Sequence, residues 1–436
     1  MPGRPVPADV VRVGLLGAGT VGGALVNLLG EESAVLASSA GVRLELARVA
    51  VSDLSRARGP SLPAALLTDD PFAVVSDPGV DVVVELMGGV EPARELVLAA
   101  LRAGKPVVTA NKELLATSGG ELFETAAKVG VDLLFEAAVG GAIPLVRPLR
   151  ESLAGERLSR VMGIVNGTTN YVLTKMSEGG VSYEEALSQA QELGYAERDP
   201  TADVEGHDAA AKAAILASLA FGAEVLVTDV AREGISRLRA EDVAFARRQG
   251  YEVKLLAVAE RLQDPAGGTT VSVRVHPAMV PRSHPLASVR DAHNAVFIEG
   301  PAIGELMLYG RGAGGAPTAA AVLGDLIDAA HNLRQGSSSR LAGRERARMH
   351  PAERLTCAYS LGVDVLDRPG VLASVAGVFG SHDVSIRSME QVGLGDEARM
   401  VFVTHLAVEA DMSATLEDLE ALDAVRRVGA LLRVVD

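Results

Sequence analysis

Two charged residues one helical turn apart carry the strongest chemical signal in this sequence. The stretch ERDPTADVEGHDAAAK, residues 197–212, gathers five carboxylates, a histidine and a lysine beside a long apolar run. Asp208 and Lys212 are four positions apart, so they share one face of the helix predicted over 208–221. Such a pair is either a solvent-facing ion pair or an acid and an ammonium presented to a ligand. In a pocket, an ammonium can protonate an oxygen on which negative charge develops.

A glycine-rich turn near the N-terminus predicts a dinucleotide site. GAGTVG holds Gly17, Gly19 and Gly22 in the G-x-G-x-x-G spacing, with Thr20 and Val21 between them. It follows the β-branched run VRVGLL and precedes an apolar helical pattern. Glycine lets the backbone turn sharply and approach a pyrophosphate, whose charge the N-terminus of the helix then stabilises. The strand-turn-helix context favours this interpretation over a purely structural turn.

The end of the second predicted strand bears on the choice of cofactor. The segment there is VSDLSRAR. In dinucleotide-binding folds, the residue that binds the adenosine ribose is expected at this position. Asp53 can accept a hydrogen bond from a 2′-hydroxyl, whereas Arg56 and Arg58 can bind a 2′-phosphate. Two guanidiniums favour NADP, and NAD remains possible.

Three further stretches place polar groups at predicted strand ends or helix starts. Lys112 follows a predicted parallel strand, at the edge where open α/β sheets bind ligands, or it is an ordinary surface lysine. Glu136 precedes a glycine-rich turn whose carbonyls can coordinate a hard monovalent cation, although a domain junction also explains the turn. Thr168, Thr169 and Asn170 can cap a helix or bind a small polar ligand.

Alternating strand and helix patterns give the organisation of the chain. In 1–138 they predict an α/β fold, a parallel doubly wound sheet of Rossmann type. A looser mixture of helices and strands over 139–305 predicts a second, α+β domain. Residues 331–353 are predicted to form a linker, because they are rich in glycine, serine and charged residues and lack a periodic apolar pattern. The βαββαβ order in 354–436 predicts a small domain of ferredoxin-like topology.

Composition excludes several classes of function. The chain has 436 residues and a formal net charge of −15, which argues against a nucleic-acid partner. The single cysteine, Cys357, excludes an internal disulfide framework and suits a reducing compartment. The N-terminus lacks an apolar signal region and the chain lacks a long apolar run, so we expect a cytoplasmic protein without a membrane span.

Taken together, these motifs resemble homoserine dehydrogenase. The resemblance rests on GAGTVG, VVTANK, FEAAVGGAIP, GIVNGTTNY, LGYAERDPTADVEGHDAAAKAAIL and YGRGAGGAPTA, in this order and spacing. The block LDRPGVLASVAGVFGSHDVSIRSMEQ resembles an ACT domain, an amino-acid-sensing module. The resemblance implies a monofunctional, NAD(P)-dependent enzyme that interconverts L-aspartate 4-semialdehyde and L-homoserine, on the route to threonine and methionine. It also implies a Rossmann domain completed by about 306–330, a substrate and dimerisation domain at 139–305, and a homodimer or homotetramer.

The same resemblance implies roles for single residues. Lys212 matches the proton donor of the family, and Lys112 matches a lysine that touches cofactor and substrate. A sodium ion is implied at Glu136, and L-threonine is implied as a feedback inhibitor bound by the ACT domain, at a Pro-Gly turn. Ser52 stands where many members carry an arginine, which keeps the choice between NADP and NAD open. The other implied residues are Glu197, Asp208, Asp203, Tyr195 and Thr168 for substrate, Gly194 and Gly312 near the nicotinamide, and the carbonyls of Val139, Gly141 and Ile143 for sodium.

Two alternatives to this activity stay open on the sequence. One is an amino-acid or nucleotide sensor that has lost catalysis, and the other is a dehydrogenase of a related semialdehyde. A sensor without catalysis would not need Lys112, Glu197, Asp208 and Lys212, and all four are present.

Overall fold

The chain forms two compact units in a computed structural model that describes residues 10–31, 41–56, 62–264, 267–338, 345–393 and 395–435. The first unit combines Met1–Glu156, Ala214–Val227 and Leu308–Arg346, and the second combines Arg157–Ala213, Thr228–Met307 and Ala347–Asp436. Both units are therefore assembled from segments that lie far apart in the sequence.

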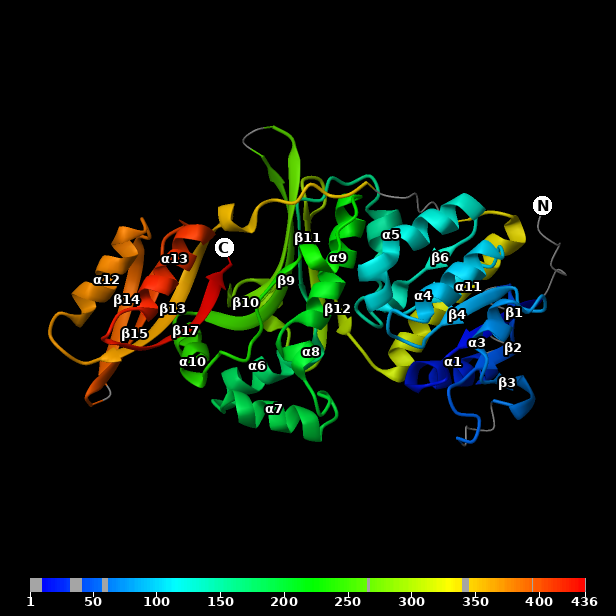
Figure 1. The fold of residues 1–436 in the computed structure, drawn as a ribbon, viewed down its shortest axis with the longest axis horizontal. Coiled ribbons are helices and arrows are strands. Elements are labelled where there is room, and N and C mark those ends of the chain that lie inside the picture. The colour runs from blue at the N-terminus through cyan, green and yellow to red at the C-terminus, as the bar shows by residue number, and fades with distance from the viewer. Residues whose placement is uncertain are drawn as a thin grey trace. The chain divides into compact units, whose positions relative to one another are not determined.

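The first unit is built on a parallel sheet with the strand order β3-β2-β1-β4-β5-β6 (Figure 1). The chain adds β2 and β3 on one side of β1 and then adds β4, β5 and β6 on the other side. Dinucleotide-binding folds have this strand order, so the predicted Rossmann class is confirmed. Buried Val and Leu residues fill the central strands on both faces, as a sheet covered on two sides requires. The strands are β1 (Val10–Leu16), β2 (Arg43–Ala50), β3 (Leu67–Thr68), β4 (Val82–Glu85), β5 (Val107–Thr109) and β6 (Leu133–Leu134).

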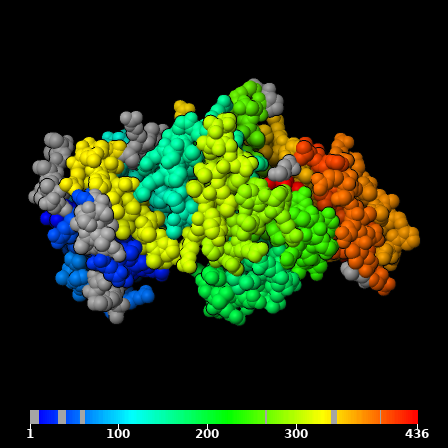
Figure 2. Space-filling model, turned by 180° about the vertical axis from the view of Figure 1, so that it is seen from behind, coloured from blue at the N-terminus to red at the C-terminus, as the bar shows by residue number. Residues whose placement is uncertain are grey.

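Helices cover the sheet of the first unit, and one of them comes from the segment after residue 308. Ala319, Val322 and Leu326 of α11 are buried in the same core as Val13 and Leu15 of β1. In Figure 2 the yellow surface of this returning segment lies against the blue N-terminal part of the unit. The helices are α1 (Thr20–Glu31), α3 (Pro71–Val75), α4 (Ala93–Arg102), α5 (Lys112–Val129) and α11 (Gly315–Gln335). Since α11 ends at Gln335, the first residues of the predicted linker are helical.

The second unit is built on a long, mainly antiparallel sheet. Its order from β11 onward is β11-β7-β9-β10-β17-β13-β15-β14, and the pairing of β10 with β17 is parallel and short. These strands are β7 (Arg160–Ile164), β8 (Ala231–Arg232), β9 (Tyr251–Gln263), β10 (Thr269–Pro281) and β11 (His293–Gly300), after which β12 (Gly304–Arg311) follows along the chain. The helices of this part are α6 (Gly167–Gly179), α7 (Tyr183–Glu192), α8 (Thr201–Val204), α9 (His207–Phe221, which continues into the first unit) and α10 (Ala240–Arg248).

The C-terminal part of the second unit has the predicted βαββαβ order, with one additional short strand. Its sheet order β17-β13-β15-β14 places the two terminal strands side by side, as in ferredoxin-like folds, so the prediction is confirmed. Phe379 of α12 and Phe402 of β15 meet in its core, with ring centroids 4.9 Å apart. The elements are β13 (Thr356–Leu366), α12 (Val371–Ser381), β14 (Ile386–Gly393), β15 (Glu397–Thr404), β16 (Ala407–Val408), α13 (Glu409–Glu420) and β17 (Val425–Val434).

No helix in the described ranges is long and apolar enough to cross a bilayer.

Candidate active site

Two glycines, one in the loop after β1 and one in the first turn of α1, leave no room for a side chain. Gly17 has a φ angle of 96°, and a Cβ on it would lie 2.7 Å from the carbonyl oxygen of Leu86. A Cβ on Gly22 would lie 2.1 Å from the carbonyl oxygen of Gly17, so the first turn of α1 packs directly on the loop. Gly19 instead faces open space, with nothing within 4 Å of the same position. The loop therefore exposes its backbone at Gly19, just before the N-terminus of α1, where an anion is favoured.

A cavity of about 450 Å³ opens at this loop. The Arg56 and Ser52 side chains line it, whereas the Asp53 Oδ1 accepts hydrogen bonds from the Ser55 backbone N–H at 2.8 Å and the Ser55 hydroxyl at 2.6 Å. Arg58 lies outside the described residues. Of the fingerprint, Gly17 and Gly19 line the cavity, and Thr20, Val21 and Gly22 form the first turn of α1. The full lining is Gly17, Ala18, Gly19, Ala50, Val51, Ser52, Arg56, Asp69, Pro71, Leu86 and Met87.

Glu85 lies behind this cavity, where it holds the backbone of the lining residue Met87, and was missed by the sequence analysis. It is fully buried at the end of β4, where its carboxylate accepts hydrogen bonds from the backbone N–H groups of Met87 and Gly88 at 2.8 and 3.2 Å. The Thr109 hydroxyl donates to its other oxygen at 2.6 Å. A carboxylate at the end of an apolar strand, in VVVEL, was the available signal, because the carboxyl ends of parallel strands bind ligands.

Lys112 lies at the carboxyl edge of the same sheet, as predicted. It is the first residue of α5, and Asn111 caps this helix by accepting a hydrogen bond from the Leu114 N–H at 3.1 Å. The Asn111 amide also donates to the Gly89 carbonyl at 2.6 Å. Lys112 is half-buried.

In the second unit, Lys212 and Asp208 form a largely buried ion pair on α9. The Lys212 Nζ donates to the Asp208 Oδ2 at 2.7 Å and to the Val165 carbonyl oxygen at 2.7 Å. The two side chains are only 12% and 10% exposed, so the pair is not the solvent-facing one that a surface helix would carry. An ammonium has three N–H bonds, and these contacts within the second unit use two of them.

Asn166 joins this pair to a second carboxylate, and the sequence analysis did not single it out. Its Nδ2 donates to the Asp203 Oδ1 at 2.7 Å and to the Asp208 Oδ2 at 2.9 Å. Its Oδ1 accepts from the Thr169 N–H at 2.9 Å, so Asn166 is also the N-cap of α6. The cap was expected among Thr168, Thr169 and Asn170, and that expectation was wrong by two residues or more. Asparagine is a strong N-cap, which was the available signal.

The LGYAE segment lies beside this cluster on an exposed loop. The Thr168 hydroxyl donates to the Tyr195 carbonyl oxygen at 2.6 Å, which ties the loop to the start of α6. Tyr195 is 46% exposed, and Gly194, with a φ angle of 75°, and Glu197 are also exposed. The cluster of Asn166, Asp203, Asp208 and Lys212 is therefore preformed, whereas the Glu197 carboxylate lies in solvent.

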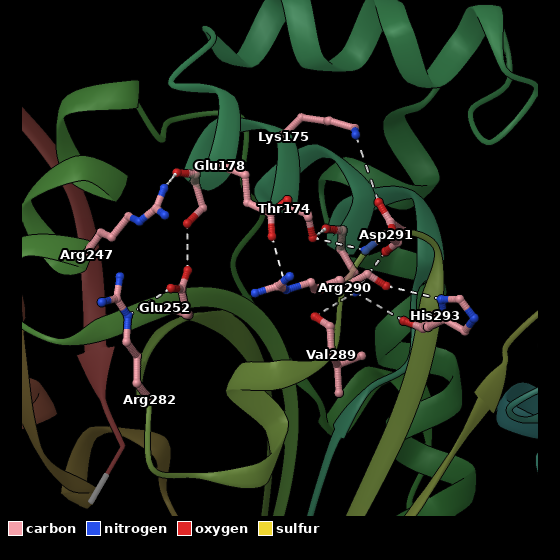
Figure 3. Close-up of polar contacts among 12 residues, drawn as sticks. Thr174, Lys175, Glu178, Arg247, Glu252, Arg282, Val289, Arg290, Asp291 and His293 are labelled. Carbon is pink, nitrogen blue, oxygen red and sulfur yellow. Dashed lines mark hydrogen bonds and ion pairs between the residues drawn. The ribbon is translucent and has the colours of Figure 1, made fainter.

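Polar contacts fix α6, which positions Asn166. Figure 3 shows Thr174 and Lys175 of this helix reaching Asp291 in the loop before β11. The Thr174 hydroxyl accepts from the Asp291 N–H at 3.2 Å, and the Lys175 Nζ lies 4.0 Å from the Asp291 carboxylate. Beneath them the Asn170 amide donates to the Asp291 carbonyl at 2.9 Å and accepts from the Lys254 Nζ at 3.1 Å. Burial lowers the pKa of Lys254 to about 8. Asn170 is therefore a structural residue of this helix.

Glu136 holds the turn predicted to bind a cation. Its carboxylate is buried and accepts the backbone N–H groups of Leu145, Val146 and Arg147 at 2.5, 2.8 and 2.9 Å. Two of these bonds fall on Oε1 and one on Oε2, so Oε2 keeps a lone pair for another partner. The carbonyl oxygens of Val139, Gly141 and Ile143 receive no backbone hydrogen bond within the described chain. These acceptors fit a hard cation with oxygen ligands. No cluster of three or more His, Cys, Asp or Glu side chains suited to a metal was found among the described residues.

The returning segment packs against this turn. A Cβ on Gly141 would lie 2.5 Å from the Gly312 carbonyl oxygen, and the Ala142 N–H donates to the Arg311 carbonyl at 3.2 Å. On α11, the Asp325 Oδ2 accepts the Glu136 N–H at 2.7 Å. Burial raises the pKa of Asp325 to about 7, and the hydrogen bond from Glu136 opposes that rise. The GRGAGG and VGGAI motifs are therefore brought together within the first unit.

Family models match three segments of the chain. Residues 17–136 match the model described as homoserine dehydrogenase, NAD binding domain, and residues 144–327 match the model described as homoserine dehydrogenase. Residues 359–424 match the ACT domain.

Known proteins similar to the chain agree with these matches. The homoserine dehydrogenase of Corynebacterium glutamicum is 49% identical over 431 residues, covering 98% of this chain and 96% of that protein. That of Mycobacterium tuberculosis is 49% identical over 441 residues, covering 100% and 99%. The structure of a homoserine dehydrogenase from Thiobacillus denitrificans superposes with a TM-score of 0.91 at 40% identity, covering 98% of this chain and 99% of that one. A hyperthermophilic archaeal homoserine dehydrogenase in complex with NADPH gives a TM-score of 0.61 at 30% identity, covering 73% and 97%.

Proposed function

The chain belongs to the homoserine dehydrogenase family of NAD(P)-dependent oxidoreductases, and we propose how its own residues carry out the reaction. The family interconverts L-aspartate 4-semialdehyde and L-homoserine. The observation that carries the proposal is the buried contact of Lys212 with Asp208 at 2.7 Å, at the start of a helix and beside Asn166.

Lys212 is the general acid of the reduction and the general base of the oxidation. The nicotinamide, when bound, supplies the hydride to the aldehyde carbon or accepts it from the alcohol. Negative charge develops on the aldehyde oxygen, and the remaining N–H of Lys212 stabilises this charge and provides the proton. Asp208 and the Val165 carbonyl hold the Nζ in one position, so no reorganisation is needed when the charge appears.

The carboxylates near Lys212 bind the other end of the substrate. Asp208 and Glu197 accept hydrogen bonds from the substrate α-ammonium, and Asp203 supports them through Asn166. Tyr195 and Thr168 complete the substrate wall, since the Thr168 hydroxyl fixes the loop that carries Tyr195 and Glu197. Because Glu197 is exposed, its contact with the ammonium forms only when substrate is present.

The cofactor is NADP in preference to NAD. Arg56 lines the cavity beside Gly19, where a guanidinium can bind a 2′-phosphate, whereas the Asp53 Oδ1 already accepts two hydrogen bonds from Ser55. The NADPH named with the archaeal relative supports this choice. Lys112 at the edge of the same sheet contacts cofactor and substrate, and Gly194 and Gly312 lie near the nicotinamide.

Sodium binds at Glu136 and at the carbonyls of Val139, Gly141 and Ile143. Free acceptors in a buried turn support this proposal, and the ion would hold the turn rather than take part in hydride transfer. Glu136 is tied to Asp325 of α11 by its backbone N–H, so the role of the sodium ion is to stabilise this part of the fold.

L-Threonine bound by the C-terminal domain inhibits the enzyme. The enzyme works in the cytoplasm, and it assembles as a homodimer or homotetramer. The match of 359–424 to the ACT domain supports amino-acid regulation in general. The proposed use of the NADP(H) pool supports the cytoplasmic location.

One assay tests the reaction, the cofactor preference and the response to threonine together. NAD(P)H absorbance is followed with L-homoserine as substrate, with each dinucleotide in turn and with or without L-threonine. The proposal is supported if turnover at low dinucleotide concentration is faster with NADP than with NAD. It is also supported if turnover falls when threonine is added. Turnover with another α-amino acid that carries a primary hydroxyl on its side chain, but none with homoserine, would contradict the substrate assignment.

A further inference from the structure

A buried carboxylate lies behind the cofactor cavity of the first unit without a cationic partner. Glu85 ends β4 and is 0% exposed. Three donors point at its two oxygens, namely the backbone N–H groups of Met87 and Gly88 and the Thr109 hydroxyl. Within the described ranges, no lysine, arginine or histidine forms an ion pair with Glu85. Its three donors are neutral, so they stabilise the carboxylate but leave its negative charge uncompensated.

The hydrogen bonds alone do not require an acid at this position. A buried acid is costly in a protein interior and is usually paired with a cation. A glutamine would make the same contacts, since its Oε1 can accept from Met87 and Gly88 and its Nε2 can donate to the Thr109 oxygen. A negative charge at Glu85 is therefore best explained by a positive charge that arrives with a ligand.

The loop after Glu85 directs negative charge toward the cavity. In a trans peptide the C=O points away from the N–H, so the two bonds to Glu85 turn the carbonyl oxygens of Leu86 and Met87 to the opposite side. The Leu86 oxygen faces the glycine loop, since a Cβ on Gly17 would lie 2.7 Å from it. Leu86 and Met87 also line the cavity. The two peptide dipoles and the carboxylate behind them therefore act in the same direction.

The nicotinamide half of a bound dinucleotide belongs on this side of the sheet. The pyrophosphate is expected at Gly19, before α1, and the adenosine ribose at the end of β2. Because β2 and β4 flank β1 on opposite sides, the other half of the cofactor extends toward the ends of β4 and β5. Gly88 and Gly89 are exposed there, and a Cβ on either would meet nothing within 4 Å. The loop thus leaves open space for a flat ring.

We propose that Glu85 favours the oxidised nicotinamide, which carries a positive charge, over the neutral reduced ring. In aldehyde reduction a hydride leaves the ring with two electrons for the aldehyde carbon, the aldehyde oxygen receives a proton, and the ring keeps one positive charge. A carboxylate in a low-dielectric interior stabilises that charge as it develops. Glu85 therefore lowers the reduction potential of the bound dinucleotide. The proposal rests on the proposed cofactor site.

Calorimetric titration of the full-length protein with the oxidised and the reduced dinucleotide tests the proposal. Glu85→Gln should raise the ratio of the oxidised to the reduced Kd by about tenfold, because a buried charge is lost while the shape of the side chain is kept. For this two-electron couple, a tenfold change corresponds to about 30 mV.

Two control variants separate charge from structure. Thr109→Val removes a hydrogen bond to Glu85 but no charge, so both Kd values should shift together and their ratio should stay constant. Glu124→Gln removes a charge at the surface of the same unit, where Glu124 is 59% exposed and pairs with Lys128, and it should leave the ratio unchanged.

A neutral probe keeps the proposal testable if a thermal melt shows that Glu85→Gln does not fold. In the benzamide analogue of the oxidised dinucleotide, an uncharged ring of the same shape replaces the pyridinium. The wild type should bind this analogue about tenfold more weakly than the oxidised dinucleotide, because only the pyridinium is attracted by Glu85.

Four outcomes would overturn the role of Glu85. They are an unchanged ratio in folded Glu85→Gln, an equal change of the ratio in Thr109→Val, equal wild-type affinity for the charged and the neutral ring, and no binding of either dinucleotide to the wild type. Turnover of homoserine reports separately on the proposed function. A wild type that binds both dinucleotides as expected but does not turn over homoserine would refute the reaction and leave the assignment of Glu85 standing.

Discussion

The side-chain amide of Asn166 donates to the Asp208 Oδ2 at 2.9 Å across 42 positions of sequence. The same oxygen accepts from the Lys212 Nζ at 2.7 Å, so one carboxylate oxygen is held by a neutral and a charged donor at once. Both hydrogens of the Asn166 amide are used, because the second goes to Asp203. Asn166 thereby sets the distance between the two carboxylates and fixes the one that orients Lys212.

Replacing Lys212 by alanine should lower kcat by about 100-fold or more, because the proton donor is lost. Cofactor affinity should stay nearly unchanged, since the glycine loop and its cavity belong to the other unit. Steady-state kinetics and a dinucleotide titration measure the two quantities. Lys128→Ala is the control, because Lys128 is 71% exposed and pairs with Glu124 in a surface contact. Wild-type turnover in Lys212→Ala would remove Lys212 from catalysis.

Asn166→Asp should lower kcat/KM by about tenfold or more, as a hydrogen bond to a charged group contributes about 1.5–3 kcal/mol. Aspartate keeps the cap of α6, so the fold should survive, but it replaces the donor to Asp203 and Asp208 with a third acceptor. Kinetics together with a thermal melt separate the two effects. An unchanged kcat/KM in a folded variant would show that the Asn166 bonds do not position the site.

Arg56→Ala should raise the KM for NADP by about tenfold or more and leave that for NAD nearly constant, because only NADP carries the 2′-phosphate. The matched control is Arg43→Ala, whose guanidinium pairs with Glu45 on the surface of the same unit. Saturation curves with both dinucleotides give the ratio. Equal effects on the two cofactors would mean that Arg56 does not bind the phosphate.

Exchange of sodium for tetramethylammonium should lower thermal stability and activity, because that ion is too large for the carbonyls of the 139–143 turn. Melting temperature and turnover are compared at equal ionic strength, with lithium, sodium and potassium as a series. Identical melts in all salts would speak against a cation at Glu136.

Asp325→Asn should flatten the pH dependence of stability between about pH 4 and 7. Burial raises the pKa of the Asp325 carboxyl to about 7, from a usual value near 4. In this window the folded chain binds a proton that the unfolded chain has released, so the free energy of unfolding falls as the pH rises. The slope reaches at most about 1.4 kcal/mol per pH unit for one proton. Calorimetric melts of wild type and variant at several pH values give the difference, and parallel curves would contradict the raised pKa.

Much of the fold follows from local sequence. Two patterns predicted the observed elements: the strand-turn-helix pattern around Gly17 and the βαββαβ order of the C-terminal part. Both depend on the spacing of apolar residues and on glycine positions, which influence the backbone within a few residues. The spacing of Asp208 and Lys212 likewise fixed their mutual contact, since four residues make one helical turn.

The residues that could do chemistry, namely Lys212, Lys112 and the glycine loop, were evident from residue type and spacing, and so was the class of fold that carries them. Three features became visible only in the folded chain: the ion pair is buried, Asn166 joins it to Asp203, and Asp325 supports Glu136 from 189 positions away. The physical reason is that burial and long-range hydrogen bonds depend on which segments the fold brings together. A local pattern carries no record of a partner that lies tens or hundreds of residues along the chain.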